Sequence, residues 1–304
     1  MSAEELIVIT CAAGRQNSFL LPHLATKPNY KLRLVVHSDN SRAKLSTEYP
    51  NAEVVQADLE DPFAVRALLH NATILYHVGP PFHPHETQIG YHAIDAALAE
   101  SKRPGNRFKH FIYSSVLNTQ LRKLLNHDCK RYVEEYLIES GLNYTILQPT
   151  HFMDNLPLQL MLEKGMYPAP YNADVKFSFL ALRDLAEVAA KVIGEGEKHY
   201  LAQYPLCSTG PVSYRERIEL FDRLFGKKTR IVEVPYGEAC RSFGKRLFGE
   251  EVDQKRLDGV QRLLLYYDNY GLKGNISVCE WLLGRKPETL EQWYKVEMEK
   301  LSSE

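Results

Sequence analysis

The residues at positions 9–17, ITCAAGRQN, combine a glycine, small side chains and the start of a helical pattern. In a turn of the GxGxxG type, one glycine permits the tight bend, another lets the backbone approach a pyrophosphate, and a third lets the helix pack on the strand. Gly14 keeps the middle role, while Cys11 and Asn17 occupy the outer two positions. Because a helix N-terminus attracts phosphate whatever the glycine count, the stretch predicts a dinucleotide-binding turn. An ordinary strand-to-helix connection is the alternative.

The end of the second predicted strand, LVVHSDNSRAK at 34–44, bears on the choice between the two nicotinamide cofactors. An Asp or Glu there accepts from the ribose 2′-OH, whereas a cation or hydroxyl accommodates a 2′-phosphate. Asp39 lies one or two positions late for the first role. The side chains suited to the second role are His37, Ser38, Arg42 and Lys44, with Arg15 of the first turn as a further cation. This composition favours NADP(H) over NAD(H), and a solvated charged turn is the alternative.

Short runs of β-branched residues alternate with helical patterns through the first half of the chain. The predicted strands are Leu6–Thr10, Leu32–His37, Glu53–Ala57, Ile74–Val78, Phe108–Ser114 and Tyr144–Gln148. Helices fill the intervals, as at Gln88–Glu100 and Leu121–Ser140. Near-continuous apolar strands joined by helical crossovers predict an α/β fold, a Rossmann-like doubly wound parallel sheet with helices on both faces.

The pattern becomes more helical and irregular after residue 152. We expect residues 1–152 to form the NAD(P)-binding domain and residues 153–304 to form a smaller, mostly helical lobe for a substrate or partner. A strand and a helix near 175–194 are expected to return to the first domain, so that the two parts interleave.

Composition excludes several classes of function. The formal net charge of −1 over 304 residues provides no field that would gather nucleic acid or an anionic membrane. No apolar run approaches the roughly 18 residues that span a bilayer, and no leader precedes the first strand. Five cysteines without a CxxC pair fit reduced thiols. We therefore expect a cytoplasmic protein, or a nuclear one if it is a regulator, that binds neither nucleic acid directly nor a membrane.

Several stretches spread along the chain resemble one known family. They are ITCAAGRQN, similar to VTGATGxQG, together with VVQADLEDPFAVRALL (54–69), HFIYSSV (110–116), FSFLALRDLAEVAAKVI (177–193) and LLGRKPETLEQW (282–293). The most specific is CKRYVEEYLIESGLNYTILQPTHFMDNL at 129–156. The sequence thus resembles the NmrA-like family, atypical relatives of the short-chain dehydrogenases/reductases that include transcriptional co-regulators, NADPH sensors and reductases.

The resemblance, together with the first turn and Arg42, implies cofactor contacts along the carboxyl ends of the strands, where ligands of open sheets bind. Asp58 and Leu59 would lie near adenine, and the HVGPPF segment would turn past the ribose. The implied residues are Thr10, Cys11, Gly14, Arg15, Gln16, His37, Ser38, Arg42, Asp58, Leu59, Val78, Gly79, Pro80, Lys130, Pro149, Thr150, His151 and Phe152.

The usual catalytic pair of the wider reductase superfamily is incomplete. There a Tyr and a Lys four residues later share a helix face; the Tyr donates the proton, and the Lys lowers the pKa of that Tyr and holds the ribose. Lys130 is present, but Asn126 stands where the Tyr would be. Lys130 is thus expected as a ribose anchor or, after desolvation, as a proton donor or base. The candidate substitutes for the Tyr are Ser114, Asn126 and His151, with Ser115, Tyr113 and His127 nearby. For Tyr113 and Tyr132, aromatic packing is the favoured interpretation.

The histidines of the fourth strand and the loop after it raise the question of a metal. They are His77, His83, His85 and His92. The HPHE stretch at 83–86 has no downstream ligands at recognisable zinc spacing, so no metal is expected. A loop that faces the substrate is favoured instead.

Three functions fit these observations. The favoured one is an NADPH-dependent reductase of a hydrophobic carbonyl, imine or activated alkene. The second is a non-catalytic NADP(H)-sensing regulator that acts through a protein partner, because the tyrosine and two loop glycines are missing. The third is a redox-neutral isomerase or cyclase on the same scaffold. Either a monomer or a homodimer is compatible with the sequence.

Overall fold

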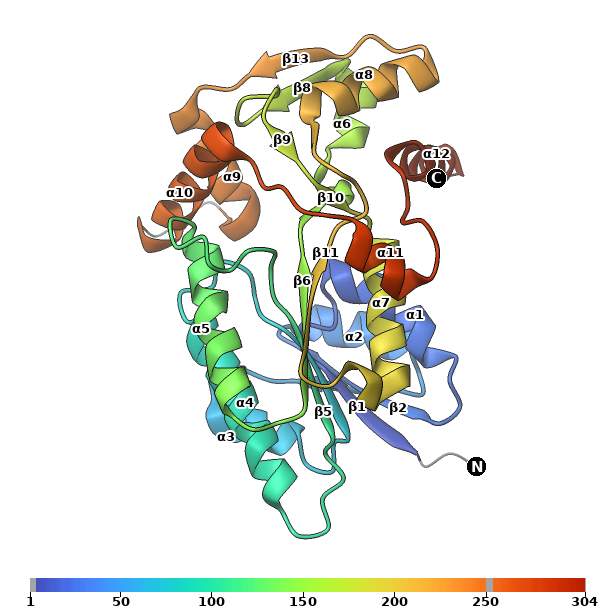
Figure 1. Cartoon of the computed structure of the whole chain (residues 1–304), viewed down its shortest axis with the longest axis vertical. Helices are drawn as coiled ribbons and strands as arrows, with labels where there is room; N and C mark the ends of the chain where they lie inside the picture. The colour runs from blue at the N-terminus through green and yellow to red at the C-terminus, as the bar shows by residue number, and fades with distance from the viewer. Residues whose placement is uncertain (1–3, 250–253, 304) are drawn as a thin grey trace. The chain divides into compact units, whose positions relative to one another are not determined.

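The computed structural model describes residues 4–249 and 254–303. Its main sheet has seven strands in the order β11-β6-β5-β4-β1-β2-β3 (Figure 1). The strands are β1 (Glu5–Ile9), β2 (Tyr30–Val36), β3 (Glu53–Gln56), β4 (Ile74–Val78), β5 (His110–Ser114), β6 (Tyr144–Pro149) and β11 (Ala202–Leu206). The pairings from β3 through to β6 are all parallel. Chain order reverses between β1 and β4, which is the switch point at which open α/β sheets bind ligands.

The predicted Rossmann-like α/β class is confirmed, and all six predicted strands are present close to their predicted limits. The sequence did not predict β11, whose short run AQYPL contains Pro205. Because β11 is an edge strand, a residue without an N–H donor is tolerated there. One predicted helix is also shorter than expected, since α5 begins at Leu125 rather than at Leu121.

Helices cover both faces of the sheet (Figure 1). On one face lie α3 (Pro62–Leu68), α4 (Glu86–Lys102) and α5 (Leu125–Glu139), and on the other lie α1 (Arg15–Ala25), α2 (Asp39–Glu48) and α7 (Leu182–Glu195). One buried cluster joins the sheet to α3, α4 and α5. It contains Leu75 and Phe111 of the sheet with Val65, Ile94 and Val133 of these three helices. Strands buried on both faces explain the near-continuous apolar runs.

The chain forms two compact units. Unit 1 comprises the described residues up to 120 with 129–148 and 185–204, and unit 2 comprises 121–128, 149–184 and the described residues from 205 onward. The helix of the 175–194 segment, α7, joins unit 1 from Leu185, whereas the short strands at 176–180 lie in unit 2. Within the described residues, none of the helices combines the length and apolarity needed to cross a bilayer.

Unit 2 consists of short strands in two-stranded pairs, together with helices. The strands are β7 (His151–Phe152), β8 (Met166–Ala169), β9 (Lys176–Phe177), β10 (Phe179–Leu180), β12 (Val212–Ser213) and β13 (Arg230–Glu233), paired as β10-β7, β12-β9 and β13-β8. The helices are α6 (Leu158–Lys164), α8 (Tyr214–Phe225), α9 (Tyr236–Phe248), α10 (Gln254–Tyr270), α11 (Ser277–Leu283) and α12 (Leu290–Ser303). Short 3-10 helices occur at Met153–Asn155 here and at Gly196–His199 in unit 1. The core of unit 2 is aromatic, with Tyr167, Phe177, Phe179 and Tyr214 buried.

Candidate dinucleotide-binding site

The turn after β1 is tight around Gly14. The Gly14 N–H donates to the Cys11 carbonyl at 2.8 Å, and Gly14 then caps the N-terminus of α1 without a side chain. A Cβ added at Gly14 would lie 3.0 Å from the Cys11 carbonyl oxygen, which is closer than real side chains normally approach. The turn therefore presents bare backbone and the positive end of an 11-residue helix, the features that bind phosphate.

The two residues that replace glycines in this turn, Cys11 and Asn17, are linked by a hydrogen bond. Cys11 adopts φ of 48°, the left-handed conformation that glycine adopts most easily. Asn17 is buried, and its side-chain amide donates to the carbonyls of both Thr10 and Cys11 at 3.0 Å. Asn17 thus fixes the strained residue, and the glycine-like turn is kept by hydrogen bonds.

The turn after β2 presents hydroxyl and basic groups to solvent. His37 and Ser38 are exposed, and the Ser38 side chain accepts from the Ser41 N–H as the cap of α2. Asp39, the residue judged late for a ribose contact, lies 3.3 Å from Arg42 in an exposed ion pair. Because such a pair holds its partners weakly, Arg42 can exchange Asp39 for another anion.

A mostly buried ion pair in unit 1 joins Lys130 of α5 to Glu86, the first residue of α4. The side chains are only 12% and 2% exposed. Burial, the largest single influence, lowers the pKa of Lys130, but the charge and hydrogen bond of Glu86, together with Tyr113 and Cys129, raise it above its usual value. The other Glu86 oxygen accepts from the Phe82 N–H at 3.1 Å. Lys130 is therefore held as a fixed cation.

A glycine lets the elements that carry this pair approach closely. A Cβ at Gly90 would lie 2.5 Å from a Val133 methyl group, so α4 and α5 pack tightly there. A Cβ at Gly79, in the segment after β4, would lie 3.4 Å from a Glu86 oxygen, an ordinary contact, so the pair does not require a glycine there. Glu86 was not predicted from the sequence, although it is the last residue of HPHE, because the histidines are the residues of that stretch that suggest chemistry.

Other predicted residues of unit 1 form hydrogen bonds at the same sheet edge. Ser114, at the end of β5, donates to the Gln16 side chain in the first turn of α1 at 2.7 Å. The Thr10 hydroxyl bonds the backbone of Val78 in both directions and lies 3.0 Å from His77 Nδ1. Burial lowers the pKa of His77 to about 3, so its ring is neutral. These bonds connect the end of β5 to the first turn of α1, and the end of β1 to the end of β4.

Further predicted contacts lie in the loops after β3 and β4. Asp58 is exposed and accepts from the Glu60 N–H at 2.9 Å, while Leu59 is half-buried. Gly79 is buried between two half-buried neighbours, Val78 and Pro80. Tyr113 is buried and stacks on His77 with ring centroids 5.7 Å apart, and burial raises its pKa. It is a packed aromatic side chain rather than an accessible acid.

Unit 2 contains Asn126, at the start of α5, and the Pro149–Phe152 segment. His151 Nε2 lies 2.9 Å from the Tyr214 hydroxyl, inside a ring of aromatic side chains. Burial, with the positive charges of Arg217 and Arg246, lowers the pKa of His151 to about 3. The ring is therefore neutral near pH 7 and is a hydrogen-bond partner rather than a cationic acid. Thr150 donates to the Ser178 carbonyl at 3.1 Å.

Comparison with known proteins agrees with this arrangement. A model of the NmrA-like family matches residues 3–302. The NAD(P)H azoreductase of Xenophilus azovorans is 25% identical over 256 residues, which cover 81% of this chain and 83% of that protein.

Solved structures share the fold at lower identity. The NADPH-dependent quinone oxidoreductase QOR2 of Escherichia coli, in complex with NADPH, has a TM-score of 0.78 at 21% identity, with 96% of this chain and 99% of that one covered. NmrA, a negative transcriptional regulator solved with NAD, has a TM-score of 0.77 at 17% identity, with coverage of 99% and 98%. The resemblance predicted from short motifs is confirmed, and because one family model extends over nearly the whole sequence, the chain belongs to the NmrA-like family.

Proposed function

We propose that this protein is an NADP(H)-dependent reductase of a hydrophobic small molecule. The observation that carries the proposal is the buried Lys130–Glu86 ion pair beside Gly79, at the sheet edge where ligands of such folds bind. Relatives that reduce azo compounds and quinones with nicotinamide cofactors support it.

The residues present fit such a cofactor. At Gly14 a side chain would meet the Cys11 carbonyl, so only bare backbone faces a pyrophosphate there. Exposed Ser38 and Arg42 suit a 2′-phosphate, which favours NADP(H). Lys130, kept protonated and in place by Glu86, would donate hydrogen bonds to ribose hydroxyls. When bound, the reduced nicotinamide supplies a hydride.

The groups that could donate a proton to the reduced substrate limit the class of substrate. The Lys130 pKa is raised, so the ammonium gives up its proton reluctantly. Ser114, the other predicted group of unit 1, already donates to Gln16. Neither is a strong acid, and the Tyr of the usual pair is replaced by Asn126. We infer a conjugated acceptor, such as a quinone-like carbonyl, because its reduced anion is delocalised and can take a proton from water.

The test begins with calorimetric titration of NADPH, NADP, NADH and NAD into the full chain. We expect selective binding of the two phosphorylated forms, followed by loss of NADPH absorbance when quinones are added. Lys130→Ala should weaken binding, whereas Lys31→Ala, at an exposed pair with Glu4, should not. The double variant Lys130→Met/Glu86→Gln removes both buried charges and separates loss of the ribose contact from misfolding. Failure of all four nucleotides to bind the wild type would refute the proposal.

A second candidate is a regulator that binds NADP(H) without turnover. The replacement of the proton-donating Tyr by Asn126 favours it, and one structural relative is a negative transcriptional regulator. It predicts tight nucleotide binding but no NADPH oxidation with any quinone, azo or carbonyl acceptor. Turnover that is lost in the charge-free double variant would exclude it.

A further inference from the structure

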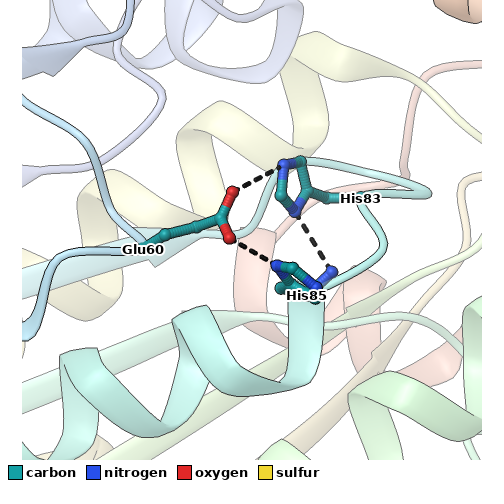
Figure 2. Close-up of side chains that lie close together, drawn as sticks. All are labelled: Glu60, His83 and His85. Atoms are coloured by element: carbon teal, nitrogen blue, oxygen red, sulfur yellow. Dashed lines mark hydrogen bonds and ion pairs between the residues drawn. The ribbon is translucent and has the colours of Figure 1, made fainter.

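Two histidines and one carboxylate meet at the surface of unit 1 (Figure 2). Glu60 lies between β3 and α3, and His83 and His85 lie between β4 and α4. His83 Nε2 is 3.3 Å from one Glu60 oxygen, and His85 Nδ1 is bonded to the other. One donor atom from each residue lies within 4.8 Å of the other two. The side chains are partly exposed, at 40% for Glu60, 26% for His83 and 59% for His85.

We propose that this Glu60–His83–His85 cluster is a binding site for a divalent transition-metal ion, with zinc the best fit. Imidazole nitrogen and carboxylate oxygen are ordinary zinc ligands at about 2.0–2.2 Å. Tetrahedral geometry at these bond lengths places neighbouring ligand atoms about 3.3 Å apart, which is the separation of His83 Nε2 from Glu60. Three protein ligands on an accessible surface leave a fourth position for water. Two imidazoles select against magnesium and calcium, which prefer oxygen.

The loop that carries the histidines is held from its inner side. Phe82, with φ of 59°, donates its N–H to Glu86, the buried partner of Lys130. This anchor turns the chain so that His83 and His85 both face outward toward Glu60 (Figure 2). A preformed arrangement of three donors reduces the ordering entropy that a metal ion must offset.

In the metal-free protein, protons occupy the places that the metal would take. The backbone N–H of His85 donates to His83 Nδ1 at 3.2 Å. Because Nδ1 is an acceptor, a neutral His83 ring carries its proton on Nε2, which faces Glu60. Metal binding at Nε2 would move that ring proton to Nδ1, so the charge of the ring would not change. The backbone N–H of His85 would then donate to water instead of to His83 Nδ1. At His85 likewise, Nδ1 would bind the ion in the tautomer that carries its proton on Nε2.

The spacing of the histidines alone could not reveal this site. No ligand follows HPHE at recognisable zinc spacing, and the third donor lies 25 positions upstream of His85. A bound ion would tie the segment after β4 to the segment after β3. The proposal is independent of the cofactor, because its three donors are not among the predicted dinucleotide contacts.

The test is calorimetric titration of chelator-treated full chain with zinc chloride, and the absorption spectrum of the Co²⁺ form as a second readout. We expect one zinc ion per chain at this site and a tetrahedral cobalt spectrum. His83→Ala, His85→Ala and Glu60→Gln should each weaken binding by more than about ten-fold, the smallest loss seen when even an outer partner of a ligand is removed.

His23→Ala is the matched control, because His23 is an exposed histidine of the same unit whose backbone carbonyl accepts from the Thr26 hydroxyl. It should leave zinc binding unchanged. Circular dichroism of the metal-free variants checks folding, and the half-exposed His85 makes that variant the safest one. Wild-type protein that binds no zinc, or zinc binding that is equal in wild type and in the His83→Ala/His85→Ala double variant, would overturn the proposal.

Discussion

Replacing Glu86 by Gln removes one charge of the buried pair while it keeps the side-chain volume and an oxygen for the Phe82 N–H. Lys130 is only 12% exposed, so water replaces the lost carboxylate only in part. Breaking a buried ion pair from one side costs about 3–5 kcal/mol, because the other charge stays buried without compensation. We expect the free energy of unfolding near neutral pH to fall by about this amount, as measured by urea unfolding followed by circular dichroism.

The pH dependence should change sign as well. In the wild type the pKa of Lys130 is raised, so the stabilisation is complete below about pH 10.4, the unfolded-state value, and is lost only as pH rises through the folded-state pKa. In Glu86→Gln, burial is no longer offset and the pKa falls below the unfolded-state value. The unfolded state then binds more protons, so the variant gains stability as pH rises from about 7 to about 10.

Two further variants decide whether the reasoning holds. Glu4→Gln breaks an exposed pair in which Glu4 is 56% and Lys31 is 64% exposed, so the loss should stay below about 1 kcal/mol. Lys130→Met/Glu86→Gln removes both buried charges and should recover most of the stability. If Glu86→Gln and Glu4→Gln lose equally little, and the pH dependence keeps its sign, Lys130 is solvated and the argument is refuted.

The turns after β1 and β2 give three more tests. Asn17→Ala removes two hydrogen bonds to the carbonyls of Thr10 and Cys11, and should lower the free energy of unfolding by about 1–3 kcal/mol in urea; an unchanged midpoint would show that the turn does not need them. Cys11→Gly releases a positive φ worth about 1 kcal/mol, whereas β-branched Cys11→Val increases the strain, so the melting temperature should fall only for valine; equal losses would contradict the left-handed geometry. Arg42→Ala should raise the Kd for NADPH about ten-fold, or about 1.4 kcal/mol, and leave that for NADH unchanged; a loss shared by both cofactors would place Arg42 away from the 2′-phosphate.

The fold was predictable where each local signal had one interpretation. Strands buried on both faces are apolar throughout, so β4 and β5 could be located from their composition alone. β11 is an edge strand with a proline, and its sequence resembles a loop. The division into units was harder to predict, because the chain passes between them several times and each passage depends on contacts distant in sequence.

The candidate site was predictable only in its local parts. The Gly14 turn and the end of β2 are short segments whose residue types indicate their chemistry. Glu86 is different, since an acidic residue at the start of a helix ordinarily interacts with the helix dipole in solvent. Only the fold buries it and brings it to Lys130, 44 positions along the chain. Glu60 lies beside His83 and His85 for the same reason, because their loops precede α3 and α4, two helices that pack against each other.

The first turn shows why the number of glycines is a poor measure of whether a dinucleotide-binding loop is intact. What phosphate requires is backbone N–H groups at a helix end with no side chain in front of them, and Gly14 provides that space. A cysteine in a left-handed conformation is costly by itself, and a buried asparagine amide is costly without acceptors. The Asn17 N–H groups offset part of both costs, because they donate to the carbonyls of Thr10 and the strained Cys11, while the buried Asn17 Oδ1 has no hydrogen-bond partner among the described residues. The two replacements together therefore keep a tight turn that leads through Gly14 into the N-terminus of α1.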